Sequence, residues 1–367
     1  MTEGFNRWWL LPFSILTTSA LLALSVIVFQ PSFINRSYAV VAQQVASKTA
    51  VDCSGAAASD YACYQRRYQD LVHGSGVAAA FADLKDEYQK NAFVSTNCHQ
   101  LTHVIGRAAV DLYGDLSGTY AQGDTFCQAG YYHGAIEALA AKIGSDKIVD
   151  EANTICADLA ESERYSFYHY SCVHGLGHGF MGVLNNELYK SLETCDKLTD
   201  EWEREQCYDG VFMQNVMAAY DPSYPTKYLK ADQPLYPCTD VQDKYKTQCY
   251  KRQIWYALYT QGNDFSKVFD LCGTINDGYR TTCYEGLGRD ASWRSESDVA
   301  KTKDTCMLGE DYEARSSCVA GAVEGFSLYY DSDQGEAQAK ELCGSLEADL
   351  RTVCLQAGKE YFEDLQT

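Results

Sequence analysis

The sequence predicts an all-α protein in which disulfide-stapled helical hairpins form a solenoid, preceded by one N-terminal transmembrane helix. Three observations predict this fold class. Sixteen cysteines recur in regularly spaced couples, all of them beyond residue 50. The segments between them carry turn residues but no alternating strand pattern. In addition, residues 8–29 form an uncharged run near the N-terminus.

The composition indicates a folded protein with a substantial core. The chain has 367 residues, 46% of them hydrophobic, and only 6 prolines, which argues against disorder. Its formal net charge of −20 makes nucleic acid and anionic lipid headgroups poor partners, because both are themselves negatively charged. We therefore interpret the acidity as a solubilising surface.

The uncharged run predicts contact with a membrane. Residues 8–29 are long enough to cross a bilayer, and Trp8 and Trp9 stand where interfacial anchors belong. A cleaved signal peptide is the alternative, since the segment ending at Ala39 loosely fits a cleavage site. The run is longer than a normal signal core and ends well before Ala39, which favours an uncleaved anchor. Because Arg7 is the only positive cue, the orientation depends mainly on the cysteines.

The cysteines predict a disulfide framework. An even number of cysteines beyond a targeting segment is typical of an oxidising, extracytoplasmic compartment. Reduced cysteines binding zinc are the alternative, but such sites favour CxxC pairs and the chain has none. Consecutive cysteines are therefore predicted to pair as Cys53–Cys63, Cys98–Cys127, Cys156–Cys172, Cys195–Cys207, Cys238–Cys249, Cys272–Cys283, Cys306–Cys318 and Cys343–Cys354.

The later couples reveal an internal repeat. Their second cysteine recurs every 34 to 45 residues, the period of a two-helix solenoid unit. A basic residue precedes it by three positions and a glycine often follows it by three, as with Arg280, Cys283 and Gly286. Each unit is predicted to be two helices joined by a turn and by a bridge worth about 2–3 kcal/mol. In layout alone, this resembles cysteine-bridged Sel1-like and tetratricopeptide repeat proteins, which implies a helical solenoid.

These observations divide the chain into four parts. They predict a single-pass membrane protein with most of its chain on the periplasmic or cell-surface side. The parts are a short tail at 1–7, a transmembrane anchor or uncleaved signal at 8–30, a linker at 31–50, and an extracytoplasmic α-helical repeat domain at 51–367. Within the last part, residues 98–182 hold a predicted histidine-rich site.

Six of the seven histidines fall between residues 99 and 178. Pairs spaced by four residues share one face of a helix, so the predicted helices present these histidines in clusters. We therefore expect a metal site near the first full units of the repeat. Its predicted ligands are His99, His103, His133, His174 and His178, with Glu137 as a further ligand or a general base.

The internal repeat supplies a control for this prediction. Aligned on the second cysteine, His133 and His178 stand six residues after it, where later units have residues such as Met213 and Trp255. The repeat itself therefore does not require histidine there. Positions two, six and ten after the cysteine share one narrow stripe of a helix, which includes His174. Imidazoles of adjacent units should meet along it, because stacked helices lie about 9–10 Å apart.

The available donor atoms limit which metals the predicted site could bind. Histidine nitrogens with one carboxylate, while the thiolates are held in disulfides, suit a divalent transition metal such as zinc, copper or iron. One ion needs three or four ligands, so the full set could serve a dinuclear centre. Open positions on the metal could activate water or oxygen. Arg107, Tyr131 and Tyr132 are predicted to support the ligands or to contact a substrate.

Other interpretations of the histidines stay open. The five predicted ligands could instead be histidines hydrogen-bonded between packed helices, or a metal-free acid–base site. His169 stands where later units have arginine or lysine, which favours a solvated or hydrogen-bonding residue. His73 lies at a predicted helix end and is interpreted as a partner of the helix dipole.

The sequence thus favours a membrane-anchored metalloprotein, either a metal-dependent hydrolase or an oxidoreductase. One alternative is a non-catalytic solenoid scaffold that binds a protein or peptide, and another is a metal storage or transfer protein. The confinement of the histidines to two units argues against the scaffold, which would spread its distinctive residues along the array. The chain contains no HExxH, CxxCH or GxSxG motif and no Walker loop.

Overall fold

The computed structural model describes residues 51–162, 166–220, 225–276, 278–295, 298–329 and 332–362. The predicted tail at 1–7, anchor at 8–30 and linker at 31–50 lie outside these residues. Within the described ranges, no helix combines the length and the apolar character needed to cross a bilayer.

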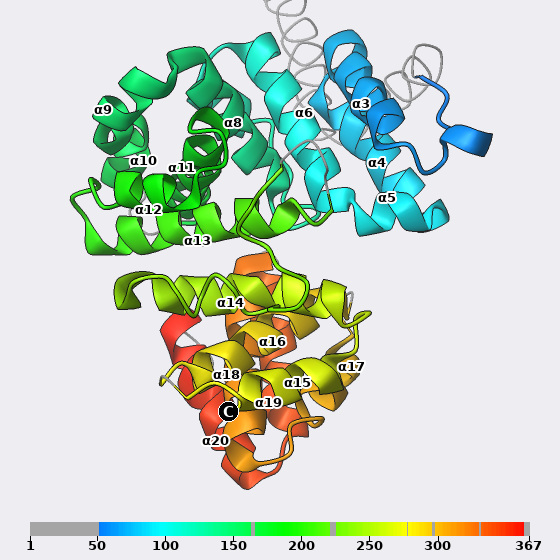
Figure 1. The fold of residues 1–367 in the computed structure, drawn as a ribbon. Helices are drawn as coiled ribbons and strands as arrows, with labels where there is room; N and C mark the ends of the chain where they lie inside the picture. The colour runs from blue at the N-terminus through cyan, green and yellow to red at the C-terminus, as the bar shows by residue number, and fades with distance from the viewer. Residues whose placement is uncertain are drawn as a thin grey trace, which may run out of the picture.

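The described part of the chain is all-helical and contains no strand (Figure 1). The longer helices of the array are α3 (Tyr61–Ser75), α4 (Val77–Lys90), α6 (Cys98–Tyr113), α8 (Gly130–Ile143), α11 (Phe167–Val183), α13 (Glu201–Met217), α14 (Asp243–Thr260), α16 (Arg280–Arg294), α18 (Tyr312–Tyr329) and α20 (Ala348–Tyr361). The elements around them are η1 (Gly55–Ala57), α5 (Ala92–Thr96), α7 (Leu116–Tyr120), α9 (Ser145–Ile155), α10 (Ala157–Ser162), α12 (Leu188–Cys195), α15 (Phe265–Gly273), α17 (Val299–Cys306) and α19 (Ser332–Ser345).

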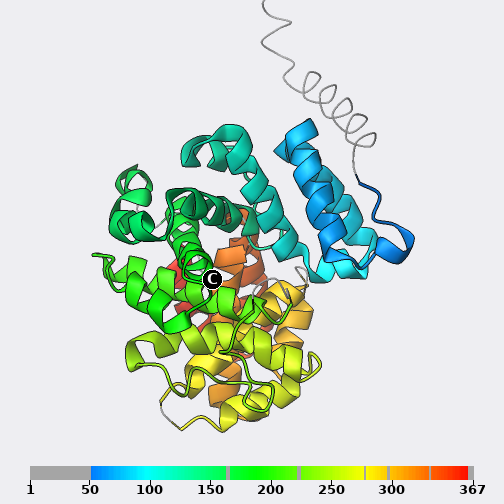
Figure 2. The same cartoon turned by 45° about the horizontal axis from the view of Figure 1, so that its top comes forward.

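Most of the longer helices pack against one another in chain order. α6 lies between α3 and α8, α11 lies between α8 and α13, and the series continues through α14, α16 and α18 to α20. In Figure 1, α14 to α20 (yellow-green to red) lie below the earlier helices, and Figure 2 shows the same array turned forward. The array also curls back on itself, because His99 of α6 contacts Trp255 of α14 with 6.0 Å between ring centroids.

All sixteen cysteines are paired, each with its neighbour in the sequence. Several bridges join a shorter helix to the longer helix that follows, as Cys272 of α15 joins Cys283 of α16. The bridge between Cys98 and Cys127 differs, because it joins the start of α6 to the segment just before α8. It therefore ties together two helices that carry histidines.

Short polar side chains set the beginnings of several helices. Asp200, Asp264 and Asp298 each accept a hydrogen bond from the backbone N–H three residues further on. Each bond satisfies a donor that the first turn of α13, α15 or α17 would otherwise leave without a partner. These caps fix where each helix begins and hence which of its residues face the interior.

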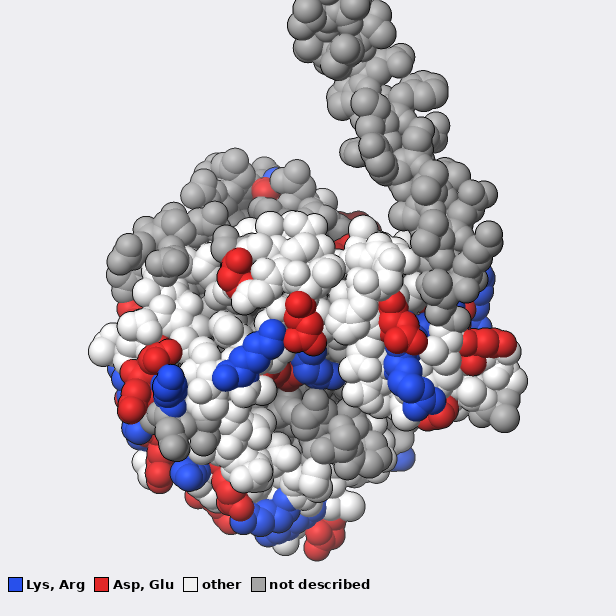
Figure 3. All heavy atoms as spheres, turned by 90° about the horizontal axis from the view of Figure 1, so that it is seen from above, with Lys and Arg blue, Asp and Glu red and all other residues white. Residues whose placement is uncertain are grey.

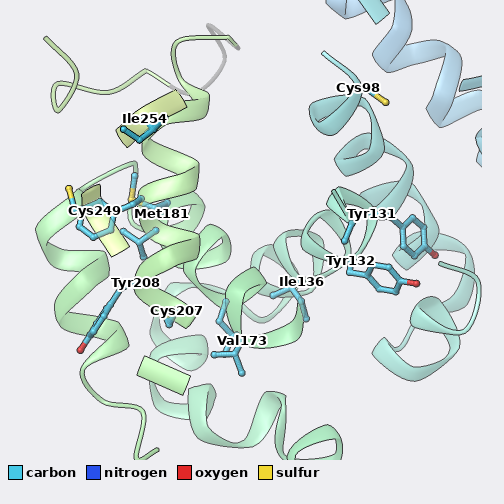
Figure 4. Packing of buried hydrophobic residues seen from close by; sticks show 14 of the residues in the cluster. Cys98, Tyr131, Tyr132, Ile136, Val173, Met181, Cys207, Tyr208, Cys249 and Ile254 are labelled. Carbon is cyan, nitrogen blue, oxygen red and sulfur yellow. The ribbon is translucent and has the colours of Figure 1, made fainter. Parts of the chain in front are cut away.

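A hydrophobic core runs between the helices. Figure 4 shows part of it, with Tyr131 and Ile136 of α8, Val173 of α11 and Ile254 of α14 among its buried residues. On the face seen in Figure 3, acidic and basic side chains are interspersed among uncharged residues. Interspersed charges of both signs avoid large surface regions of a single charge.

Candidate metal centre

The histidines predicted as ligands meet at one place inside the helix array. α6 carries His99 and His103, α8 carries His133, and α11 carries His174 and His178. All five are buried, with at most 2% of each residue exposed. Neighbouring rings lie 4.5–5.5 Å apart between centroids. These five imidazoles form what we call the histidine cluster.

Close helix contacts correct the repeat alignment on which the prediction rested. Gly134 of α8 lies against the carbonyl group of His103, as Gly210 of α13 lies against the carbonyl group of His174. In the repeat alignment, Gly130 stands three residues after Cys127, where later units often have a glycine. The contacts show that Gly134, and not Gly130, is the counterpart of that glycine. The predicted register of α8 was wrong because Cys127 precedes the helix and bridges to α6.

The correction shifts α8 by four residues, from Gly130 to Gly134, which is about one helical turn. His133 becomes the counterpart of His174, and Glu137 that of His178. Because four residues rotate a helix by only about 40° beyond a full turn, the shifted residues keep the same face. The predicted stripe therefore converges in spite of the wrong register.

His99 and His103 turn two unprotonated nitrogens towards each other. Nδ1–H of His99 donates to the carbonyl group of Cys127, and Nδ1–H of His103 donates to Glu137, both at 2.9 Å. A neutral imidazole carries one proton, so both Nε2 atoms then hold lone pairs. These two Nε2 atoms lie only 3.0 Å apart. Lone pairs at this distance repel each other unless a cation lies beside both.

His174 and His178 repeat this arrangement. Nδ1–H of His174 donates to Asp209 at 3.0 Å, and Nδ1–H of His178 donates to Gln214 at 2.6 Å. Both partners belong to α13. The Nε2 atoms of the two histidines lie 3.1 Å apart and again hold lone pairs.

Both spacings fit two nitrogens bound to one metal ion. Nitrogens about 2.0–2.1 Å from an ion, at angles of about 90–109°, lie about 2.8–3.4 Å apart. Histidines that bind metals also donate their second ring N–H to a carboxylate or a carbonyl group, which fixes the tautomer. All four histidines of the two pairs have an oxygen partner of this orienting kind.

His133 lies between the two pairs and is the unusual member of the cluster. Both of its ring nitrogens are buried and have no hydrogen-bond partner in the described structure. A ring nitrogen of His133 lies within 4.8 Å of nitrogens of His99 and His103, and a ring nitrogen of His133 also lies within 4.8 Å of nitrogens of His174 and His178. A buried polar group without a partner costs about 1–3 kcal/mol. A bound ion would remove that cost.

Known proteins do not identify the site. No family model, curated protein or solved structure matches this chain.

Burial favours the neutral form of four histidines of the cluster, His99, His133, His174 and His178. Burial lowers the pKa of His99, His133 and His178 well below the ordinary value of 6.5, and neighbouring imidazoles lower it further. Burial also lowers the pKa of His174 to about 4, although Asp209 opposes this shift. The neutral imidazole is the form that binds metals.

Glu137 has donors on both carboxylate oxygens. Oε1 accepts from His103, and Oε2 accepts from Arg107 at 2.6 Å. Burial alone would raise the pKa of this carboxyl group, but His103 and Arg107 hold it well below its usual range. Glu137 also lies within 4.8 Å of ring nitrogens of His103 and His178. This geometry favours an orienting or ligating role over that of a general base.

α13 and α14 supply partners that the sequence analysis did not identify. Asp209 orients His174 and is itself held by Arg252 of α14 at 2.6 Å. Met213 places its Sδ atom 3.3 Å from Nε2 of His174. Asp209 and Met213 stand two and six residues after Cys207, at positions that carry histidines in α11. That repeat position was the signal that could have found them.

The structure does not bring Tyr131 and Tyr132 to the cluster. The hydroxyl group of Tyr131 donates to the carbonyl group of Thr119 at 2.8 Å, and the ring of Tyr132 packs against Tyr120. Residues two positions apart on a helix point to nearly opposite sides. Tyr131 therefore faces the hydrophobic core while His133 faces the cluster, and no hydrogen bond or ring contact among the described residues joins either tyrosine to the five histidines.

The two remaining histidines lie outside the cluster. Nε2 of His169 lies 3.0 Å from a carboxylate oxygen of Glu203, and its ring packs against Trp202. His73 is exposed in the last turn of α3. Both positions agree with the interpretations given to them from the sequence.

A pocket of about 400 Å³ reaches the histidine cluster at His99. Gln100 of α6, Trp255 of α14 and Trp293 of α16 are among its lining residues. A small molecule in this pocket would lie beside the first histidine pair.

Proposed function

We propose that the histidine cluster holds two adjacent transition-metal ions and that the protein is a metal-dependent oxidoreductase. The observation that carries this proposal is His133, with its two buried ring nitrogens and no partner in the described structure. One position uses Nε2 of His99 and His103, and the other uses Nε2 of His174 and His178. His133 completes either position or bridges the two.

Copper is the metal that these donors favour. The second position adds the soft sulfur of Met213, 3.3 Å from Nε2 of His174, to neutral imidazole nitrogens. Thioether ligands select copper(I), and imidazole suits copper in general. Zinc and iron were the other metals expected from the sequence. Zinc sites use thiolate, imidazole and carboxylate ligands, so zinc gains little from Met213.

Oxidation–reduction is favoured over hydrolysis because the candidate general base is already engaged. Both oxygens of Glu137 accept hydrogen bonds, and its pKa is strongly lowered. A hydrolase needs a nearby group that accepts a proton from water. When bound, copper ions supply electron exchange with a small molecule, while the protein orients neutral imidazoles and excludes bulk water.

Metal storage or transfer is the second candidate, and the deep burial of all five histidines favours it. It differs from the first in predicting metal binding without turnover. A non-catalytic scaffold for a protein or peptide would leave the unpartnered nitrogens of His133 without an explanation.

We also propose a location and an architecture. Residues 8–30 would anchor the chain, with the helical part on the extracytoplasmic side. The eight disulfides support an oxidising compartment. Packing of the longer helices in chain order supports a solenoid.

Metal content tests the proposal. Protein loaded with copper and freed of excess ions should hold about two ions per chain in elemental analysis, the number that two histidine pairs can seat. His133→Leu should lower this content or weaken the binding of at least one ion. His169→Leu, which removes a buried histidine outside the cluster, should not. Wild-type protein that is correctly folded but retains no copper after this treatment would overturn the proposal.

The identity of the metal has a matched test on α13. Met213→Leu should weaken copper(I) binding and leave zinc binding unchanged. The loss should be at least ~10–100-fold, which is the effect of removing a residue that only hydrogen-bonds to a metal ligand. Met217→Leu is the control, because Met217 is equally buried in the same small hydrophobic cluster. Equal copper(I) affinities in the two variants would exclude the sulfur of Met213 as a ligand.

A further inference from the structure

The pocket beside His99 has the lining of a binding site for a flat molecule. Its volume of about 400 Å³ lies within the range of small-molecule sites, about 300–1,000 Å³. Aromatic side chains of α14 and α16 and of the segment after α13 line it. These include Tyr220, Trp255, Tyr259 and Trp293.

Two indole rings connect the pocket with the histidine cluster. Trp255 packs edge-on against His99, with 6.0 Å between centroids and 86° between planes. Trp293 stacks on Trp255 at 5.8 Å and 27°. Trp255 is only 6% exposed, whereas Trp293 is half-buried. A flat ring that entered the pocket would extend this series of aromatic contacts.

The polar groups of the pocket favour a neutral ligand with a hydroxyl group. Among the described residues that line it, Arg294 is the one Lys, Arg, Asp or Glu side chain, and its guanidinium group is already paired with Asp290. Gln100 is 4% exposed, and its Oε1 atom has no hydrogen-bond partner in the described structure. A ligand O–H could donate to this oxygen, which would otherwise stay unsatisfied.

We propose that this pocket binds a neutral, planar, hydroxylated aromatic molecule of the phenol class beside His99. The aromatic ring packs on the indole surface of Trp293, and a hydroxyl group donates to Oε1 of Gln100. The proposal rests on the proposed function only in making this molecule a substrate of the metal centre. Binding itself requires no metal.

Catechol is the probe, measured on the full chain after a chelator has removed all metal. Quenching of tryptophan fluorescence and calorimetry should show saturable binding at one site. trans-1,2-Cyclohexanediol is the control ligand, because it has similar size and hydroxyl groups but no flat ring. It should bind about tenfold more weakly, the effect of one or two aromatic contacts. Equal binding of the two ligands would overturn the inference.

Variants locate the ligand. Trp293→Leu should weaken catechol binding about tenfold, and Trp293→Phe, which keeps a flat ring, should restore most of it. Trp202→Leu is the control, because Trp202 packs against His169 outside the pocket. Circular dichroism shows whether each variant is folded. If the leucine variants at 293 and 202 bind catechol equally well, the pocket is not the site.

The outcomes of the two proposals can be told apart. A chain that binds catechol but no metal overturns the proposed function and keeps this inference. A chain that binds metal but no catechol does the reverse.

Discussion

Gly134 of α8 lies so close to the carbonyl group of His103 on α6 that a Cβ atom on residue 134 would overlap it. Gly210 of α13 meets His174 of α11 in the same way. These contacts set the spacing between the helices that carry the histidines and their partners. The absence of a side chain is what the position requires.

Gly134→Ala should push α8 away from α6. We expect it to destabilise the metal-free protein by about 1–3 kcal/mol and to weaken metal binding, because His133 and Glu137 move with the helix. Urea unfolding and metal titration measure the two effects. Gly182→Ala on α11 is the control, since an added Cβ there meets no atom of the described residues within 4 Å. Alanine at 182 should be neutral or stabilise by up to ~1 kcal/mol, and similar losses at both positions would contradict this account.

The metal-free protein should lose stability when the pH falls below about 6.5. Burial lowers the pKa of His99, His133 and His178 well below 6.5, and that of His174 to about 4. Between these values the unfolded chain binds protons that the folded chain does not. Each such histidine therefore contributes a loss of up to ~1.4 kcal/mol per pH unit as the pH falls.

Urea unfolding at pH 7.5, 6.5 and 5.5 measures this dependence. The buried carboxylates Glu137 and Asp209, whose pKa values are lowered, add to the loss only at more acidic pH. His133→Leu should make the dependence on pH less steep, because one of the titrating imidazoles is gone. A stability that stays constant from pH 7.5 to 5.5 would show that the imidazoles are not held neutral by the fold.

Asp209→Asn should impair both the metal position and the fold. Asp209 accepts from His174 and Arg252, and the charged pair with Arg252 is buried. We expect metal affinity to fall ~10–100-fold, because the ring of His174 loses its orienting carboxylate. Stability should fall by about 3–5 kcal/mol, because Arg252 loses its charged partner. Glu203→Gln is the control for metal binding, since Glu203 pairs with His169 outside the cluster.

The bridge between Cys98 and Cys127 should matter to the site as well as to stability. The carbonyl group of Cys127 accepts the Nδ1–H of His99, so the bridge holds the oxygen that fixes this tautomer. Replacing both cysteines with alanine should cost about 2–4 kcal/mol and also weaken metal binding. The same change at Cys343 and Cys354 should cost comparable stability and leave metal binding intact. Equal effects on metal binding would refute the link.

The all-helical fold class was predictable from local patterns, and the described residues confirm it. Partners such as Cys272 and Cys283 stand close in the sequence, so a short turn suffices to bring them together. The face of each helix that carries histidine was also predictable. It survived the wrong register of α8 because the error was close to a whole number of helical turns.

Residues that are adjacent in the sequence were expected to lie at the same site, but successive side chains of a helix point in different directions. Tyr131 and Tyr132 stand next to His133, yet they pack in the core, because each step along a helix turns the side chain by about 100°. Asp209 and Met213 show the opposite case, in which residues distant in the sequence reach the same site. They lie far along the chain, but α13 packs on α11 and brings them to His174.

The sequence by itself determined the helical class, the spacing of the cysteines and the helix faces on which the histidines lie. All three depend on spacing within a few residues and need no knowledge of long-range contacts. Only the tertiary structure decided that α13 orients the second histidine pair, that Trp255 reaches His99, and that the ring nitrogens of His133 find no hydrogen-bond partner among the described residues. Contacts between helices distant in the sequence depend on how the array packs and curls, and no local pattern encodes that.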